Sequence, residues 1–217
     1  MEAVDLVPRT IPPRAMMTTP HRDLRSDAGA FHNLVEAAAS RYPAPGQPVD
    51  DEGFEALLQV QCYSRVVQVF ALMVVEAALN SYGLLRFGPA ALEQKMAARK
   101  RPIALEGPVS KLRILLGAVR GTPLVDSDEI VQIVDRLARR RNALVHPEAL
   151  LFAPDATGTL EPVNTRRAGP LDVETARAAI ADIDRFIELL VTYDPEVTNF
   201  FSLSASGLYP QQPEERQ

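Results

Sequence analysis

A long apolar segment constrains the fold of this chain more than any other feature of its sequence. Residues 51–82 carry apolar side chains at helical spacing, and from Val66 onward the segment is apolar nearly all round. A helix without a polar face has to be covered by other elements, so we expect a central, buried helix that ends at Gly83. Asp51 and Glu52 place negative charge at the positive end of this helix. Its expected core face consists of Phe54, Leu57, Leu58, Cys62, Val66, Val69, Met73, Ala77 and Leu79.

The remaining patterns predict an all-α chain. Ser26 is a plausible N-cap for the first helix, Pro108 suits a first helical position, and Ser127 or Asp126 can cap a later helix. No segment predicts a strand clearly, so we expect an antiparallel helical bundle of five to six helices. Besides the central segment, the predicted helices span about residues 27–41, 90–100, 108–119, 127–146 and 172–192.

Proline-rich and polar segments divide the chain. Residues 1–25 hold four prolines and are expected to form an extended arm, in which His21 is a solvated loop residue. Residues 26–195 form the helical domain, with a loop insertion at 148–170 that has room for a small hairpin around Thr157 and Gly158. Residues 196–217 read as a tail, in which Phe200 and Phe201 have the character of packing residues.

Charge and cysteine content limit the partners that we expect. The formal net charge is −5 and the pI about 5.3, whereas proteins that coat nucleic acid are usually basic, so any contact with RNA has to be local. Cys62 is the single cysteine, which excludes an intrachain disulfide and a cysteine-based zinc site. We expect a cytoplasmic protein without a metal or cofactor. Gln68 and Glu76 interrupt the most apolar run, so we do not expect a membrane span.

The stretch Arg139–Pro147 is the strongest candidate for chemistry. Asn142 and His146 are four residues apart and share a helix face, and Arg141 lies beside it. The imidazole can take a proton from a 2′-hydroxyl or give one to a leaving oxygen. The arginine can bind two phosphate oxygens, and the amide can position either group. This set suits cleavage of RNA without a metal.

Further polar residues are candidates for the same site. Glu76 and Asn80 are four apart in the apolar central segment, where a carboxylate has to be paired or to face a cleft. An internal hydrogen bond to a neighbouring helix, with an arginine as a candidate partner, explains them equally well. The cations expected to bind substrate are Arg139, Arg140, Lys95 and Arg99.

The motif resembles the signature of HEPN domains, all-helical domains of bacterial defence, toxin–antitoxin and RNA-processing systems. That signature is an arginine, a polar residue and, a few residues later, a histidine on a late helix, here Arg141, Asn142 and His146. The resemblance covers about residues 27–193. It implies metal-independent endoribonuclease activity at a dimer cleft, with a cyclic phosphate product, His146 as acid or base and Arg141 as phosphate ligand. Glu76 and Asn80 look like the glutamate and asparagine that some members carry.

Two other interpretations stay open at the level of sequence. Some HEPN domains do not cleave RNA, and the chain would then be a helical module for protein–protein interaction or dimerisation, with an antitoxin or another protein as partner. Alternatively, Arg139–Arg141 is a solvated face and His146 binds the last carbonyls of its helix. The catalytic interpretation also predicts a homodimer, because a second copy supplies the second acid or base across a shared cleft.

Overall fold

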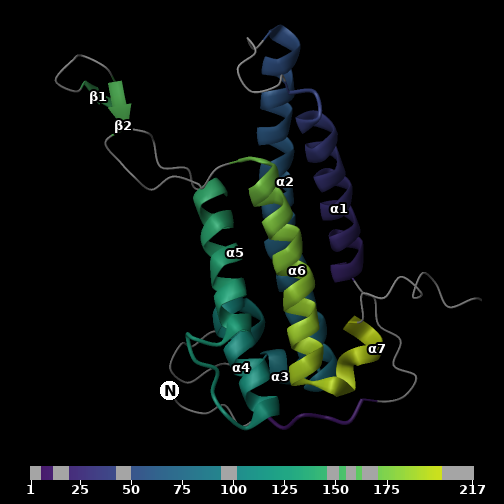
Figure 1. Ribbon diagram of the computed structural model, residues 1–217. Coiled ribbons are helices and arrows are strands. Elements are labelled where there is room, and N and C mark those ends of the chain that lie inside the picture. The colour runs from purple at the N-terminus through teal and green to yellow at the C-terminus, as the bar shows by residue number, and fades with distance from the viewer. Residues whose placement is uncertain are drawn as a thin grey trace, which may run out of the picture.

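The computed structural model describes residues 6–11, 20–42, 50–93, 102–145, 152–154, 160–162 and 171–201. These residues are mostly helical, which confirms the all-α class (Figure 1). The elements in chain order are α1 (Pro20–Ala39), α2 (Asp51–Arg86), α3 (Pro89–Glu93), the 3-10 turn η1 (Ile103–Leu105), α4 (Pro108–Arg120), α5 (Glu129–Val145), β1 (Phe152–Pro154), β2 (Leu160–Pro162), α6 (Val173–Tyr193), the 3-10 turn η2 (Pro195–Val197) and α7 (Thr198–Phe201).

The central helix α2 exists as predicted, but it continues one turn past Gly83. Gly83 stays helical and serves close packing, because a Cβ at this position would lie 2.6 Å from Cδ2 of Leu92. The helix ends instead before Gly88, which has a φ of +83°. The N–H of Gly88 donates to the carbonyl oxygens of Gly83 and Leu84, and glycine adopts this left-handed conformation without steric cost.

The core face of α2 is on the opposite side from the predicted one. Of the nine residues predicted to form that face, Leu79 is the one that is fully buried, whereas Phe54, Leu58, Cys62 and Met73 are exposed. Because the segment is apolar nearly all round, helical spacing does not distinguish its buried side from its exposed side. The residues that α2 contributes to the core are Ala56, Val60, Val67, Ala71, Leu72, Val74, Val75, Ala78, Leu79, Tyr82 and Leu85.

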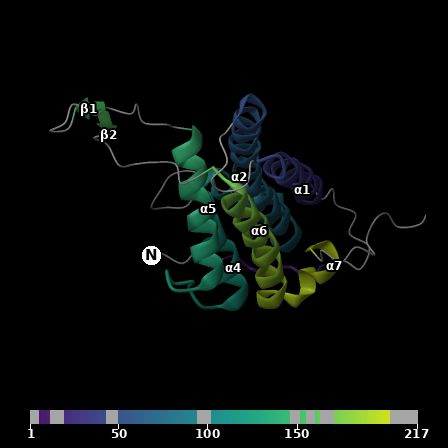
Figure 2. The ribbon, with the colours of Figure 1, turned by 45° about the horizontal axis from the view of Figure 1, so that its top comes forward.

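Four long helices pack side by side around this core. In both ribbon views α2 lies between α1 on one side and α5 on the other, and α6 packs along the front of α2 (Figure 2). Arg136 of α5 pairs with Asp182 and Glu129 pairs with Arg185, so α5 and α6 run antiparallel. Contacts from the middle and the end of α2 reach the start and the end of α6, so these two helices run parallel. The helices are therefore not all antiparallel to their neighbours, which corrects the expectation of an antiparallel bundle.

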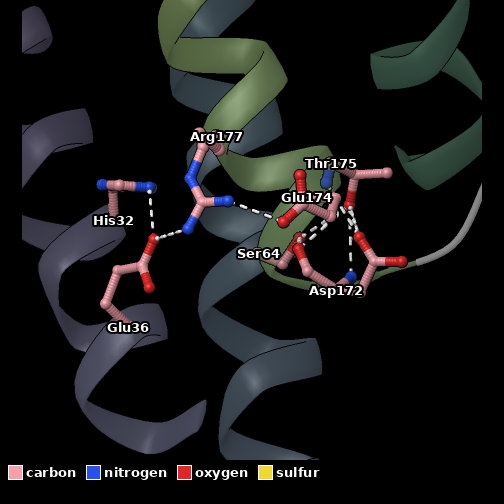
Figure 3. A network of polar contacts seen from close by, with 7 residues as sticks. All are labelled: His32, Glu36, Ser64, Asp172, Glu174, Thr175 and Arg177. Carbon is pink, nitrogen blue, oxygen red and sulfur yellow. Dashed lines mark hydrogen bonds and ion pairs between the residues drawn. The ribbon is translucent and has the colours of Figure 1, made fainter. Parts of the chain in front are cut away.

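A polar joint fixes the start of α6 against α2 and α1 (Figure 3). Asp172 and Thr175 form a capping box, in which the Asp172 carboxylate accepts the N–H of Thr175 at 2.8 Å. The buried Ser64 hydroxyl of α2 donates to the carbonyl oxygen of Asp172 at 3.0 Å. Arg177 of α6 pairs with Glu36 of α1 at 2.7 Å. These contacts set the height of α6, and through it the height of α5, along the central helix.

The N-terminal region corrects two expectations. α1 begins at Pro20, a residue that suits a first helical position, so residues 20–25 belong to the helix and Ser26 lies inside it. His21 is buried and not solvated, and its ring stacks on Phe201 with 4.7 Å between the centroids. Residues 6–11 lie along the end of α2, where Leu6 is buried and the N–H of Arg9 donates to the carbonyl of Arg86.

The later elements agree more closely with the sequence. α4 and α6 match their predicted ranges within one or two residues. α5 begins directly after Asp128, so neither Asp126 nor Ser127 occupies the capping position that we expected for them. β1 and β2 pair antiparallel, which confirms the hairpin expected around Thr157 and Gly158. Phe201 is buried in α7, so the packed body extends beyond residue 195.

By length and composition, α2 is apolar enough to cross a membrane, since an 18-residue window of it has a mean hydropathy of 1.5. This differs from the expectation that the run Val66–Leu79 is too polar to do so. Half of that window is buried against the chain's own helices. A core helix of a helical bundle has the same composition, so this test gives weak support for a membrane span.

Candidate functional site

Three consecutive arginines lie in the last two turns of α5, and their partners differ. Arg139 lies 2.6 Å from Asp135, one turn earlier in the same helix. Arg140 lies 3.9 Å from Asp182 of α6. Arg141 is half-buried, and its guanidinium donates to the amide oxygen of Asn142 at 3.2 Å. Within the described ranges, Arg141 has no carboxylate partner.

The remaining motif residues follow at the end of the helix. The described part of α5 runs to Val145, and the end predicted from the proline after His146 lies outside the described residues. Asn142 is exposed, and it shares a helix face with the position of His146. His146 itself lies outside the residues that the structure describes, as do Lys95 and Arg99. The negative end of a helix favours cations, which suits a protonated imidazole directly after α5.

Glu76 and Asn80 belong to a cluster with a buried lysine that the sequence interpretation did not single out. The ammonium of Lys111, on α4, donates to Oδ1 of Asn80 at 2.7 Å and to the carbonyl oxygen of Ala104 at 2.8 Å. Burial lowers the pKa of Lys111, whereas the negative charges of Glu76 and Glu106 act in the opposite direction. The internal hydrogen bond considered for this pair therefore exists at Asn80, with a lysine in place of an arginine, whereas Glu76 acts on Lys111 through its charge.

The structure does not join this cluster to the arginines. No hydrogen bond or ion pair between described residues connects Arg141 with Glu76 or Asn80. In Figure 1 α4, which provides Lys111, packs at the lower end of the molecule, whereas α5 ends towards the top. The candidate site within one chain is therefore the end of α5, and the Lys111 cluster is a separate polar group on α2 and α4.

A third polar group closes the lower end of the molecule. We call it the closing network, and it consists of Tyr82, Arg86, Asp194, Glu196 and the carbonyl of Arg9. Asp194, 2% exposed, lies 2.8 Å from Nε of Arg86 and accepts the Tyr82 hydroxyl at 2.9 Å. Nη1 of Arg86 donates to Glu196 at 2.6 Å and to the carbonyl of Arg9 at 2.7 Å. Burial raises the pKa of Tyr82, so its hydroxyl stays a donor.

The sequence carried weak signals for these missed residues. Tyr82 and Arg86 are four apart at the end of the apolar segment, and Lys111 lies one turn before Leu115 on the apolar side of its helix. Nothing in the proline-rich arm pointed to His21. Burial, followed by the charge of Arg22, lowers the pKa of His21 to about 4, and a weaker contact with the backbone of Phe200 acts in the opposite direction.

Comparisons with known proteins add no identification. The chain matches no protein-family model, and neither the curated proteins nor the solved structures contain a significant match. Among the described residues, no group of three or more His, Cys, Asp or Glu side chains has the arrangement of a metal site.

Proposed function

We propose that the chain is a metal-independent endoribonuclease of HEPN type, which cleaves RNA through attack of a 2′-hydroxyl at a cleft between two copies. The observation that carries the proposal is the pairing of the arginines at the end of α5. Arg139 and Arg140 each have a carboxylate partner, whereas Arg141 contacts the neutral amide of Asn142. A guanidinium without an internal acid is suited to bind two phosphate oxygens and to stabilise the charge of the transition state.

The other residues of the motif have separate roles in this proposal. His146 transfers the proton of the attacking hydroxyl or of the leaving oxygen, which a histidine of ordinary pKa does near neutral pH. Asn142 holds Arg141 in place. Arg139, Arg140, Lys95 and Arg99 provide the local positive charge that an acidic chain needs to bind RNA. Within one chain Glu76 and Asn80 lie apart from this motif, with Lys111, so their part in the proposed site is not carried by a contact to Arg141. A cytoplasmic role in bacterial defence or a toxin–antitoxin pair fits such an activity.

The test is cleavage of a mixed RNA pool by the wild type and by His146→Ala, with EDTA present throughout. We expect the wild type to cleave and to leave 2′,3′-cyclic phosphate ends, and His146→Ala to lose at least about 100-fold in rate. His32→Ala is the matched control, because His32 pairs with Glu36 on α1 and should leave the rate unchanged. Equal cleavage by His146→Ala, or loss of cleavage in EDTA, would contradict the proposed chemistry.

A second candidate function is a non-catalytic helical module that binds another protein. The exposed apolar residues on α2 favour it, because a chain that works alone rarely leaves such a surface uncovered. Absence of cleavage by a folded wild-type protein would favour this candidate, and an antitoxin or another partner would then be the molecule to find.

A further inference from the structure

The outer face of α2 carries a regular apolar repeat that the chain does not cover. Starting at Leu58, the repeat advances by four, four and three residues, so it returns to the same face every eleven residues. Leu58 is 50% exposed, and Met73 and Leu84 are each 41% exposed. An eleven-residue repeat keeps its side chains on one face of a nearly straight helix, at 3.67 residues per turn. Its members are Leu58, Cys62, Val66, Val69, Met73, Ala77, Asn80 and Leu84.

This face points away from the body of the protein. The buried residues of α2, which contact α1, α5 and α6, lie on the other side of the helix. The repeat covers 27 residues, and its two ends are about 39 Å apart along the helix. Asn80 is its single polar member, and its amide oxygen accepts from Lys111, so α4 borders the face near this end.

The charges beside the repeat favour a second copy of this chain as its partner. Arg65 is exposed, and no ion pair connects it to a described residue. Glu76 follows eleven residues later, on the same edge of the helix and three turns away. When two identical helices lie antiparallel about a two-fold axis, the same edges of both copies meet. A two-fold axis near Ala71 therefore sets Arg65 of each copy opposite Glu76 of the other.

The same axis pairs the apolar members of the repeat. Leu58 of one copy meets Leu84 of the other, and Val69 meets Met73. We infer that two copies of this chain associate through antiparallel contact of their α2 helices, with the two-fold axis near Ala71. Every exposed member of the repeat, from Leu58 to Leu84, has a counterpart in this register.

This dimer brings the two α5 ends to the same height. Ser64 of α2 is level with Asp172 of α6, and Tyr82 is level with Asp194, so Asp182 lies level with about residue 72 of α2. Arg136 and Arg140 both approach Asp182, and Arg141 is therefore level with the proposed axis.

α5 lies beside α2 (Figure 2), so the two α5 helices lie on the same side of the proposed dimer. The inference that RNA is cleaved in a cleft shared by the two copies rests on the proposed function. The α2 interface is argued independently of that function. Dimerisation is therefore measured without RNA, so that each proposal can fail alone.

A disulfide experiment tests the register. In a Cys62→Ser background, Leu58→Cys together with Leu84→Cys should give a covalent dimer as the main product after mild oxidation. Within one chain these positions are about 39 Å apart along the helix, so they cannot join each other. The two single variants, Leu58→Cys and Leu84→Cys, are the controls, and neither should form a covalent dimer in this register. Equal cross-linking by a single variant, or none by the folded double variant, would overturn the proposal.

Sedimentation provides the second measurement. The wild type should be a dimer at micromolar concentration, and Leu58→Asp should weaken association by about tenfold or more. Leu105→Asp is the matched control, because Leu105 is an equally large, exposed side chain on η1, away from the repeat. A monomeric wild type would overturn the inference, and binding of that monomer to phosphatidylcholine vesicles would assign the face to lipid instead. A dimer without RNA cleavage would overturn the proposed function alone.

Discussion

The end of α5 and the closing network both contain arginines, but they use them differently. In the closing network, Arg86 contacts two carboxylates and a backbone carbonyl, and Asp194 forms an ion pair with Arg86 and accepts the Tyr82 hydroxyl. At the end of α5, the described partner of Arg141 is a neutral amide, and its side chain is partly exposed to solvent.

The difference separates a structural role from a binding role. A buried guanidinium has to be fully paired, because an uncompensated charge in the interior costs several kcal/mol. A guanidinium at an exposed helix end does not carry this cost, and no carboxylate among the described residues neutralises Arg141. Removing a partner should therefore damage folding in the closing network and activity at the end of α5.

The largest expected effect is on Asp194. Asp194→Ala leaves Arg86 buried with one acceptor fewer and removes the acceptor of the Tyr82 hydroxyl, so the free energy of unfolding should fall by about 3–5 kcal/mol in urea denaturation. Asp184→Ala is the matched control on α6, the helix that Asp194 directly follows. The pair of Asp184 with Arg25 is partly exposed and contributes about 1 kcal/mol or less. Equal losses in the two variants would show that the closing network does not differ from a surface pair.

A smaller effect is expected from pH, at the contact between His21 and Phe201. The pKa of His21 is about 4 in the folded protein and 6.5 when the chain is unfolded. Between these values the unfolded chain binds the proton more strongly, so stability present above pH 6.5 is lost as the pH falls towards 4, by up to about 3 kcal/mol. The measurement is the unfolding free energy of wild type and His21→Phe across this range.

The substituted protein should lose this part of the pH dependence, since phenylalanine keeps the stacking and does not titrate. His32→Phe serves as the control, and its pH dependence should resemble that of the wild type. If His21→Phe follows the wild-type curve over the whole range, the buried histidine is not the group responsible.

The sequence predicted those elements whose boundary signals are local. Asp172 caps the start of α6, and both ends of that helix lie within one residue of the prediction. Likewise, the resemblance to HEPN domains rests on a contiguous motif and needed no tertiary information. The partners of Arg139, Arg140 and Arg141 could not be predicted, because Asp182 lies on a helix more than 40 residues later.

The failures share a physical reason, which is that burial is decided by distant segments. On α2, the polar residues Ser64 and Gln68 are buried because they bond to the start of α6, whereas Phe54 and Leu58 remain exposed. His21 is buried because α7, 180 residues later, covers it. Lys111 was missed since its acceptors, Asn80 and Ala104, lie on two other elements.

The measurement that tests the central claim most directly compares Arg141→Ala with Arg185→Ala in unfolding and in RNA cleavage. Arg185 is an exposed arginine paired with Glu129 and Glu188, so both substitutions should change the free energy of unfolding by no more than about 1 kcal/mol. We predict that Arg141→Ala loses at least about 100-fold in cleavage rate at this unchanged stability, while Arg185→Ala keeps the wild-type rate. Equal cleavage by the two variants, or unfolding of Arg141→Ala, would contradict the assignment of Arg141 as the phosphate ligand.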